Sequence, residues 1–478
     1  MENNSNRLSN GKHEFRNLIE AVKEKVHEGG DSLPARYSAL FDGLVDIVEY
    51  DGNSAFLIKE EYKFSVVNRV EKDGVVYIPP PTEMIPWLPL PRAEEVLKYV
   101  QHDSNQALFD DLKAYHKSIS EMPNENYYDL IAAWDFHTYC LESVQYSPNI
   151  CLFAVPERGK SRTGKGMIYV AHRGMHVESL REAYLLRVAS HSKVAIFFDV
   201  MDFWNKADKN GSQDIVLNRF EKGTKVPRVI YPDRGAFKDT VYYDVFGPTV
   251  IATNIAVHEI LETRAIQINM PETSRKFEND VTKETALPLK ERLVAFRARR
   301  LGEKLPDISK PASGRLGDIM KPILQIIQTV KPERIQSFLS LVRELEKDRL
   351  MDKGDSIEAQ ILKVIIELRG EVKRGSLSVK KIVSEFNKDK SEKEKLTDKR
   401  IGRRLCPMGF AKCRTNNGAS AIIWEESKIE RLRITYGLEK TSETSKTSET
   451  TETDATSDHG NYMRVPDVSE VSEDTEVF

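Results

Sequence analysis

The sequence contains little of what secreted and membrane proteins need. Only four of its 478 residues are cysteines, and none belongs to a C-x-x-C pair. Paired cysteines are typical of oxidising compartments and zinc sites, so we expect neither a disulfide framework nor a zinc site. No apolar run approaches the ~18 residues of a membrane-spanning helix, and the N-terminal stretch MENNSNRLSNGKHEF lacks the apolar segment of a signal peptide. We expect a cytoplasmic protein without membrane contact.

The net charge of −3 hides an asymmetry along the chain. Residues 441–478 hold ten acidic residues and two basic ones, so the part before them is net basic. This tail consists of Ser/Thr/Glu repeats such as TSETSKTSETTET, which cannot bury a core. The sequence therefore predicts a disordered acidic tail after a basic region.

Changes in periodicity divide the rest of the chain. Apolar strands alternate with helical stretches between residues 147 and 275, and this alternation predicts a parallel sheet with helices on both faces. The predicted segments are a polar N-terminal region (1–36), a small β-rich module (37–90), a helical lead-in (91–146), the α/β core (147–275), a helical lid (276–352), a winged helix-turn-helix (355–438) and the tail (439–478).

A Gly/Lys-rich turn follows the first strand of the core, in NICLFAVPERGKSRTGKGMIYV. Such a turn can wrap nucleotide phosphates with backbone N–H groups while a lysine adds positive charge. In one register Gly159 and Lys160 are the motif's Gly-Lys pair and Ser161 can bind Mg²⁺, but Ala154 replaces the leading glycine. We favour this register because it keeps the metal ligand.

A second register of the same turn stays open. It uses Gly159, Gly164 and Lys165, but Gly166 then leaves no hydroxyl for the metal. Because Gly-Lys pairs are also common by chance, an ordinary surface loop is the third interpretation. Each of the two registers departs from the phosphate-binding pattern at one residue.

An acidic residue ends the strand KVAIFFD about forty residues downstream. This position suits a Walker B aspartate, so Asp199 is predicted to hold Mg²⁺. The acid that usually follows and orients the attacking water is replaced by Val200, and Asp202 is the nearest substitute. The alternative is that Asp199 is a turn or cap residue. ATP binding is therefore better supported than ATP turnover.

Two further polar residues flank later strands of the core. The strand TVIATN ends at Asn254, where AAA+ ATPases carry a polar sensor, and Arg264 precedes the next strand, where they place an arginine that reaches a neighbouring subunit. The planar guanidinium suits charge spread over phosphoryl oxygens. The alternative for Arg264 is a structural salt bridge with Glu262 or Glu259.

Several longer segments resemble a family of ATPases. The runs VASHSKVAIFFDVMDFW, RVIYPDRGAFKDTVYYDVFGPTVIATN and ILETRAIQINMPE are similar to uncharacterised ATPases of plasmids, phages and integrated elements, which resemble primase-associated and superfamily-three-like helicases. YYDLIAAWDFHTYCLESVQYSPNICLF resembles their helical lead-in and GRLGDIMKPILQII resembles their lid. The resemblance covers residues 125–435 and implies an AAA+-like P-loop fold.

The resemblance also implies roles for individual residues. It places Lys160 and Ser161 at the phosphates, Asp199 at the metal, Asn254 as sensor, Arg264 as trans-acting arginine and Arg315 as second sensor. Val200 and Ala154 depart from the family's pattern. His172 and His176 lie near the phosphate loop and are interpreted as structural.

The segment 355–438 is predicted to bind duplex DNA. Residues 371–415 hold fourteen basic and six acidic residues, and the third predicted helix begins at Thr397 with Ile401 and Leu405 on its apolar side. A basic helix face suits contacts with phosphates. The predicted contacts are Lys399, Arg400, Arg403 and Arg404 on the helix and Lys412 and Arg414 on the hairpin. The alternative is a solvated basic helix in a module that binds protein.

These predictions combine into an ATP- and Mg²⁺-binding, helicase-like ATPase that works on DNA as a homo-oligomer, in replication or maintenance and with possible replication-protein partners. Two other classes remain open. A nucleotide-sensing DNA-binding regulator would bind ATP with little turnover, and a structural adaptor would keep only remnants of the P-loop.

Overall fold

A computed structural model describes residues 33–438 except 256, 392–393 and 416–417, so the predicted tail at 439–478 lies outside the described residues. The chain divides into two compact units, residues 1–350 and 351–478, and each is described by itself. Within the described ranges no helix combines the length and apolarity needed to cross a membrane.

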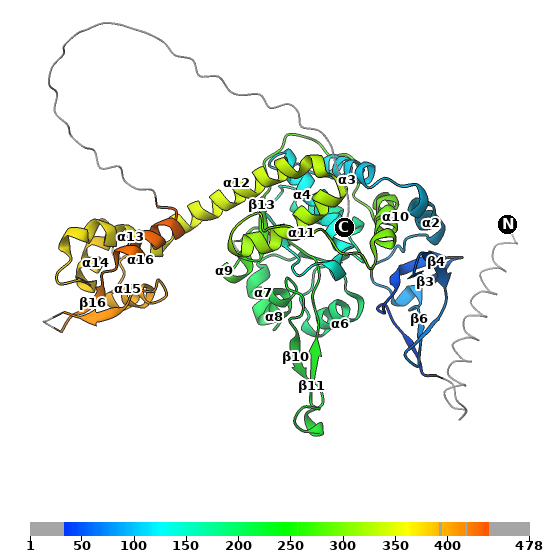
Figure 1. The fold of residues 1–478 in the computed structure, drawn as a ribbon, viewed down its shortest axis with the longest axis horizontal. Helices are drawn as coiled ribbons and strands as arrows, with labels where there is room; N and C mark the ends of the chain where they lie inside the picture. Colours follow the sequence, from blue (N-terminus) through cyan, green and yellow to red (C-terminus); the bar gives the residue numbers. More distant parts are fainter. Residues whose placement is uncertain (1–32, 256, 392–393, 416–417, 439–478) are drawn as a thin grey trace, which may run out of the picture. The chain divides into compact units, whose positions relative to one another are not determined.

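Two small sheets open the first unit (Figure 1). Strands β2, β3 and β4 form one antiparallel sheet, and β1, β6 and β5 form the other, in which β1 runs parallel to β6. The positive φ angles of Asp51 and Gly52 fit the tight turn between β2 and β3. The strands are β1 (Ala35–Tyr37), β2 (Leu44–Tyr50), β3 (Asn53–Glu60), β4 (Lys63–Val67), β5 (Val70–Lys72) and β6 (Val75–Ile78).

A five-stranded parallel sheet forms the centre of this unit, which confirms the predicted α/β core. Its spatial order is β13-β7-β12-β9-β8. The strands are β7 (Asn149–Phe153), β8 (Met175–Val177), β9 (Ile196–Asp199), β12 (Thr249–Thr253) and β13 (Ala265–Asn269), and the helices between them are α5 (Lys160–Val170), α6 (Glu182–Ser192), α7 (Phe203–Lys209), α8 (Gln213–Asn218) and α9 (Glu259–Glu262).

The strand order creates a switch point between β7 and β12. After β7 the chain crosses to β8 at one end of the sheet, whereas after β12 it crosses to β13 at the other side of β7. In open parallel sheets the crevice at the carboxyl ends of two such strands is where ligands bind. The topology therefore marks the carboxyl ends of β7 and β12.

A hairpin interrupts the sheet's sequence between β9 and β12. Strands β10 (Val226–Val229) and β11 (Thr240–Tyr243) pair only with each other and project from the body of the unit in Figure 1. The side chain of Phe237 at the tip is fully exposed, and Tyr242 is 64% exposed. The sequence did not predict this element, because its apolar residues do not follow a buried pattern.

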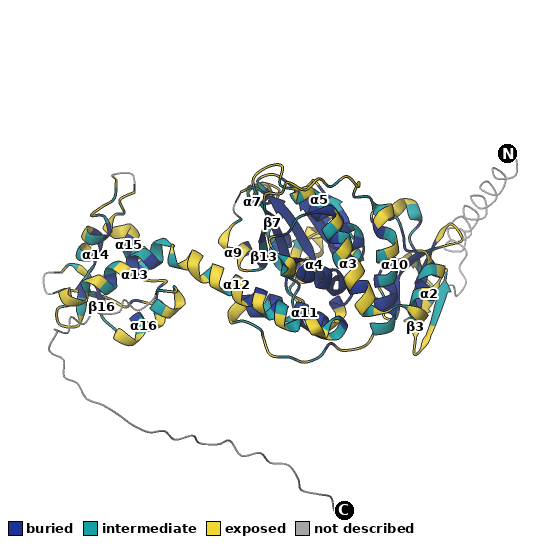
Figure 2. Cartoon of the chain, turned by 90° about the horizontal axis from the view of Figure 1, so that it is seen from above, coloured by how far each residue is buried: buried dark blue, intermediate teal, exposed yellow. Residues whose placement is uncertain are grey.

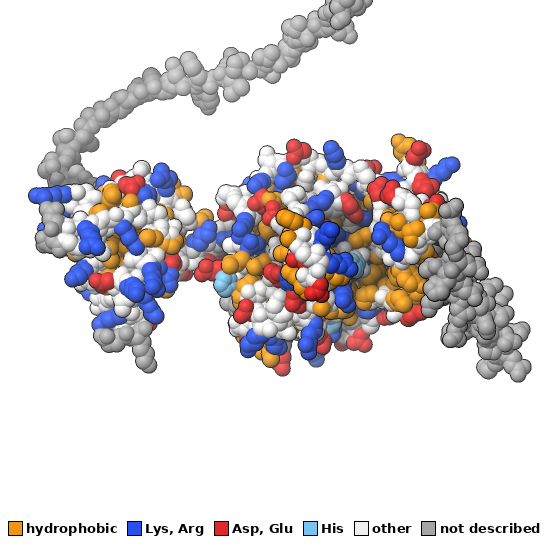
Figure 3. All heavy atoms as spheres, turned by 90° about the horizontal axis from the view of Figure 1, so that it is seen from below, with side chains coloured by type: hydrophobic (Ala, Val, Ile, Leu, Met, Phe, Trp, Pro, Cys, Tyr) orange, Lys and Arg blue, Asp and Glu red, His pale blue; other side chains and the backbone are white. Residues whose placement is uncertain are grey.

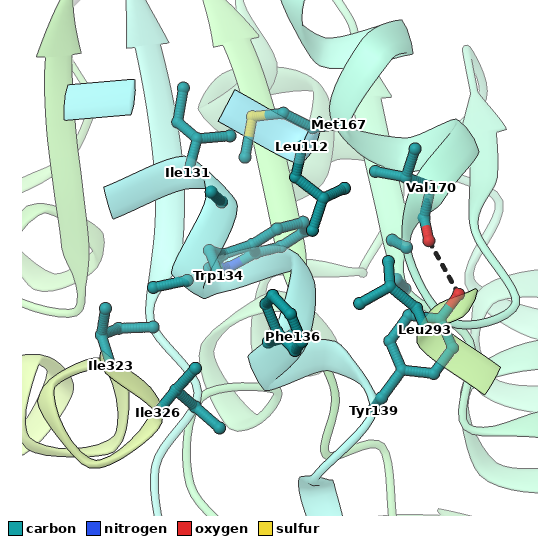
Figure 4. Close-up of a cluster of buried hydrophobic side chains, with 14 of the residues drawn as sticks. Leu112, Ile131, Trp134, Phe136, Tyr139, Met167, Val170, Leu293, Ile323 and Ile326 are labelled. Carbon is teal, nitrogen blue, oxygen red and sulfur yellow. Dashed lines mark hydrogen bonds between the residues drawn. The ribbon is translucent and has the colours of Figure 1, made fainter. Parts of the chain in front are cut away.

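Helix α4 lies in the apolar core of the first unit, and other helices pack around it. Residues 127–138 of α4 are all buried, as expected of a helix surrounded by other elements. Figure 4 shows Trp134 and Phe136 of this helix among Met167, Ile323 and Ile326 of neighbouring helices. The helices are α2 (Ala93–His102), α3 (Asn105–Ile119), α4 (Glu125–Thr138), α10 (Lys283–Arg300), α11 (Gly314–Val330) and α12 (Ile335–Gly354).

A buried ion pair joins the small N-terminal sheets to this core. Arg173, which follows α5, donates from Nε to Oδ1 of Asp46 on β2 at 2.8 Å, and both side chains are 2% exposed. Burial alone would raise the pKa of Asp46, but Arg173 and His172 outweigh it and hold that pKa well below its ordinary value. The β-strands of residues 35–78 are thus fixed to the end of α5 by charge as well as by packing.

The second unit is built from short helices and a three-stranded antiparallel sheet with the order β14-β16-β15. Its apolar core includes Ile365, Ile382, Ile401 and Leu405. The elements are α13 (Ile357–Glu367), β14 (Ser376–Ser378), α14 (Val379–Phe386), α15 (Asp398–Leu405), β15 (Lys412–Arg414), β16 (Ser420–Ile423) and α16 (Glu426–Thr435).

Helix α5 lies directly on the sheet at Gly164. A Cβ atom there would come within 2.2 Å of the Phe197 ring on β9. We predict that Gly164→Ala lowers the free energy of unfolding by about 1–3 kcal/mol, because the ring cannot yield without repacking. Urea unfolding followed by circular dichroism measures the change.

Gly402→Ala is the matched control, because it also lies inside a helix but meets no heavy atom within 4 Å. Alanine is the better helix former by about 1 kcal/mol, so this variant should be as stable as the wild type or more so. An unfolding midpoint that Gly164→Ala leaves unchanged would contradict the close contact.

Candidate functional site

The loop between β7 and α5 has the backbone of an anion cradle. It runs from residue 154 to residue 159, and Glu157 and Gly159 have φ angles of +67° and +78°. Left-handed residues in such a turn aim N–H groups into one concavity. No side chain of the described residues caps the N-terminus of α5, so its first N–H groups and the helix dipole remain available to a negatively charged group.

Lys160 is the first residue of α5, and its ammonium lies over this loop. Its Nζ atom donates to the carbonyl oxygens of Ala154 at 2.9 Å and Val155 at 2.8 Å. Partial burial lowers the pKa of Lys160, and the negative charge of Asp199 opposes that shift. Lys160 therefore already lies where a phosphate in the loop would need a cation.

The other residues of the two sequence registers lie along α5. Ser161 is exposed in the first turn, whereas Gly164 and Lys165 lie in the second turn, inside the helix. Gly164 serves the close packing on Phe197. The structure thus brings Gly159, Lys160 and Ser161 to the loop and leaves Gly164 and Lys165 beyond it.

Asp199 and Asn254 lie at the same edge of the sheet as the loop. Asp199 ends β9, and Asn254 follows β12, which lies between β9 and β7. The Oδ1 atom of Asn254 is buried and finds no hydrogen-bond partner within the described part of the chain. A buried polar atom without a partner is costly, so it suits a group that accepts a bond from a ligand or water. Figure 2 shows that the strands of the central sheet, where β7 is labelled, are buried.

Val200 occupies the position of the acid that usually follows the Walker B aspartate, and Asp202 is the nearest substitute. The structure places these two residues in different surroundings. Val200 is 5% exposed and packs in the apolar cluster with Phe198 on the sheet face away from α5. Asp202 precedes α7 with φ +52°, and its Oδ1 accepts a hydrogen bond from Asn205 at 2.8 Å. Within the described part of the chain, neither side chain forms a hydrogen bond or ion pair with Asp199.

The two histidines near the loop have different surroundings. The buried His172 has its Nε2 atom 3.5 Å from Oδ1 of Asp46, and burial lowers the pKa of His172 to about 4. His176 on β8 stacks on Phe197 with ring centroids 5.0 Å apart, and its Nε2 atom lies 3.8 Å from Oδ2 of Asp199. Sequence reasoning missed the place of His176, because the contact depends on the pairing of β8 with β9.

Arg264 and Arg315 lie together at the opposite edge. Arg264 precedes β13 and donates to the carbonyl oxygen of Ile260 at 2.6 Å, and Arg315 donates to Oγ1 of Thr263 at 2.8 Å. Burial and the charge of Arg315 lower the pKa of Arg264. The five residues of β7 separate this edge from the chain's own loop by about 13 Å. Neither arginine is brought to Lys160.

Within the described residues, no group of three or more His, Cys, Asp or Glu side chains could hold a metal ion. The donors near the loop include the hydroxyl of Ser161 and the carboxylate of Asp199. Such a set fits Mg²⁺, which keeps several waters and takes the rest of its ligands from one or two protein oxygens and the phosphates of a nucleotide. These two residues would hold it.

The second unit carries its basic side chains on α15 and β15. Lys399, Arg400, Arg403, Lys412 and Arg414 are exposed, and Figure 3 shows Lys and Arg side chains over the surface of this unit. The Oγ1 atom of Thr397 accepts a hydrogen bond from the backbone N–H of Arg400 and caps α15, as the sequence predicts. Arg404 differs from the others because it is half-buried and paired with Glu358 of α13.

Comparisons with known proteins find a weakly similar structure and do not identify a family. No family model and no curated protein matches the chain. A solved structure described as the A form apo structure of the NrS-1 C-terminal region is similar over 80% of this chain and 96% of that one, with 12% identity and a TM-score of 0.32. A likeness of this size carries no argument about function.

The position of Lys160 leads to a test of the two registers. Lys160→Ala should weaken binding of a fluorescent ATP analogue by about 10- to 100-fold, because it removes a charge-assisted bond to phosphate. Lys165→Ala, in the second turn of α5, is the matched control and should keep the affinity. Fluorescence titration measures both, and the reverse order of effects would favour the second register.

Proposed function

We propose that this protein binds ATP with Mg²⁺ at the loop between β7 and α5, hydrolyses it, and uses the energy for helicase-like work on DNA in replication or maintenance. One observation carries the proposal: Lys160, Asp199 and Asn254 lie around the loop between β7 and α5, at the switch point of the sheet. The backbone N–H groups of this loop are suited to binding an anion. The resemblance of the sequence to ATPases of mobile elements supports the same role.

Each residue around this loop has a role in the proposed reaction. The backbone of residues 154–159 and the ammonium of Lys160 would bind and orient the phosphates, and Ser161 and Asp199 would hold Mg²⁺, which offsets negative charge during phosphoryl transfer. Asn254 would position the attacking water through its buried amide. Most of the rate enhancement in phosphoryl transfer comes from such positioning and charge.

The opposite placement of Arg264 supports a homo-oligomer. Its guanidinium lies at the amino edge of the sheet, so it can serve a phosphate only in a neighbouring copy of the chain. Arg315 lies beside it and would act from the same side, which differs from a second sensor for the chain's own nucleotide. We propose that Arg264 completes the site of the next subunit.

The second unit would hold the assembly on duplex DNA. The order helix, strand, two helices and a hairpin supports a winged helix, in which α15 would enter a groove with its exposed basic face. Arg404 is engaged by Glu358, so the contacts proposed for the helix are Lys399, Arg400 and Arg403. The acidic partner limits the positive charge that α15 offers.

A second candidate function follows from Val200. Because its buried side chain cannot orient water, a nucleotide-gated DNA-binding regulator without turnover is the alternative. The two functions differ in whether the wild type consumes ATP. They share the same nucleotide site and the same DNA surface.

Hydrolysis by the full chain, measured as phosphate release with and without duplex DNA, separates these functions. We predict DNA-stimulated turnover in the wild type and a loss of at least ~100-fold in Asp199→Ala, because the metal loses its carboxylate. Asp208→Ala, which removes an exposed acid from α7, is the control and should keep wild-type rates. ATP binding without turnover in the wild type would establish the gated regulator instead.

DNA binding is tested separately by the double variant Arg400→Ala/Arg403→Ala. We predict weaker binding to duplexes of any sequence and a salt dependence that falls by roughly 0.9 per lost phosphate contact. Arg431→Ala, on the exposed surface of α16, is the matched control. Fluorescence anisotropy at several salt concentrations measures the slope, and an unchanged slope would place the DNA surface elsewhere.

A further inference from the structure

The proposed hydrolysis lacks an acid at the position where it is most often found. Val200 follows Asp199 but packs with Phe198 on the face of the sheet away from α5. Asp202 is turned to Asn205 at the start of α7. A carboxylate that orients the attacking water has to come from another element.

The neighbouring strand supplies one. Strand β8 pairs with β9 in parallel, and Val177 is the partner of Phe198. Glu178 follows Val177 directly after the end of β8, and Asp199 follows Phe198 at the end of β9, so the two residues lie side by side at the carboxyl edge of the sheet. Glu178 is therefore level with the proposed metal ligand.

One ring nitrogen of His176 lies near both carboxylates. Its Nε2 atom is 3.8 Å from Oδ2 of Asp199 and 3.9 Å from Oε1 of Glu178. The His176 ring stacks on the Phe197 ring, and the angle between the two ring planes is 19°. The Nε2 atom is buried and makes no hydrogen bond within the described part of the chain, so a short rotation of Glu178 can give it a partner.

The exposure of the two carboxylates suits different tasks. The side chain of Asp199 is 27% exposed, whereas that of Glu178 is 78% exposed. A carboxylate that holds a metal gains from a fixed position, and one that receives a proton from water needs access to solvent. The more exposed carboxylate, Glu178, is thus the one that His176 has to hold.

We propose that Glu178 is the catalytic carboxylate that orients the attacking water and accepts its proton, and that His176 is the positioning residue that keeps Glu178 beside Asp199. This inference rests on the proposed ATP hydrolysis. The water oxygen bonds to the γ-phosphorus while the bond from that phosphorus to the bridging oxygen breaks. The bridging oxygen leaves with ADP, and the water's proton passes to Glu178 and then to solvent.

The direct test is Glu178→Gln in the full chain, which keeps the size and removes the base. We predict a fall in kcat of about 100-fold or more, the usual size of such a contribution, with the affinity for a fluorescent ATP analogue retained. Analysis of the nucleotide that stays bound after incubation should find ATP on the variant and ADP on the wild type. Asp208→Asn is the matched control and should behave as the wild type.

Two variants test the positioning role of His176. His176→Phe keeps a ring on Phe197 but removes Nε2, and we predict that kcat falls about 10-fold while KM and the unfolding midpoint change little. His176→Gln keeps a side-chain N–H donor and should recover part of the lost kcat. A purely structural histidine would instead lower the unfolding midpoint without separating kcat from KM.

The outcomes distinguish this inference from the function on which it rests. Wild-type protein without turnover overturns both. Wild-type turnover that Glu178→Gln retains overturns the role of Glu178 alone, and loss of turnover in Asp202→Asn in the same series assigns the acid to Asp202. Loss of analogue binding in Glu178→Gln would make the residue part of the binding site and also overturn the inference.

Discussion

The contact between Gly164 of α5 and the Phe197 ring of β9 is the constraint on which the rest of the proposed nucleotide site depends. Only a residue without a side chain lets the helix approach the ring so closely. The helix begins at Lys160, and the same strand ends at Asp199, so this one contact sets the distance between the cation and the carboxylate. The ring of His176 also stacks on Phe197.

The parallel sheet then separates two kinds of charge. Its carboxyl edge gathers the loop, Asp199 and Asn254, and its amino edge gathers Arg264 and Arg315. Because both edges belong to one rigid sheet, these groups cannot meet within a single chain. In the proposed ATPase, an arginine at the γ-phosphate would come from another copy of the chain, and the chemistry would then depend on assembly.

Part of this architecture could be predicted from the sequence. The strands around residues 149–153, 196–199 and 249–253 are continuous apolar runs, and such runs identify buried parallel strands without knowledge of their neighbours. The capped start of α15 at Thr397 is equally local. The signals that succeeded are those that short stretches of chain carry by themselves.

Other features depend on contacts between distant residues and could not be predicted. The pairing of β1 with β6 joins residues about forty positions apart, and the hairpin at residues 226–243 exposes several apolar side chains, among them Val229, Phe237 and Tyr242. The pattern around Gly164 looks the same in a loop and in a helix, so the phosphate-loop register stayed open. Glu178 becomes visible only through the register of β8 against β9.

The most direct measurement is a crystal structure of the full chain with Mg²⁺ and a non-hydrolysable ATP analogue. The account predicts that the phosphates lie in the loop of residues 154–159, with Lys160 on the terminal phosphates and with Asp199 near the metal. A nucleotide bound at another place, or a loop that stays empty at saturating analogue, would contradict it.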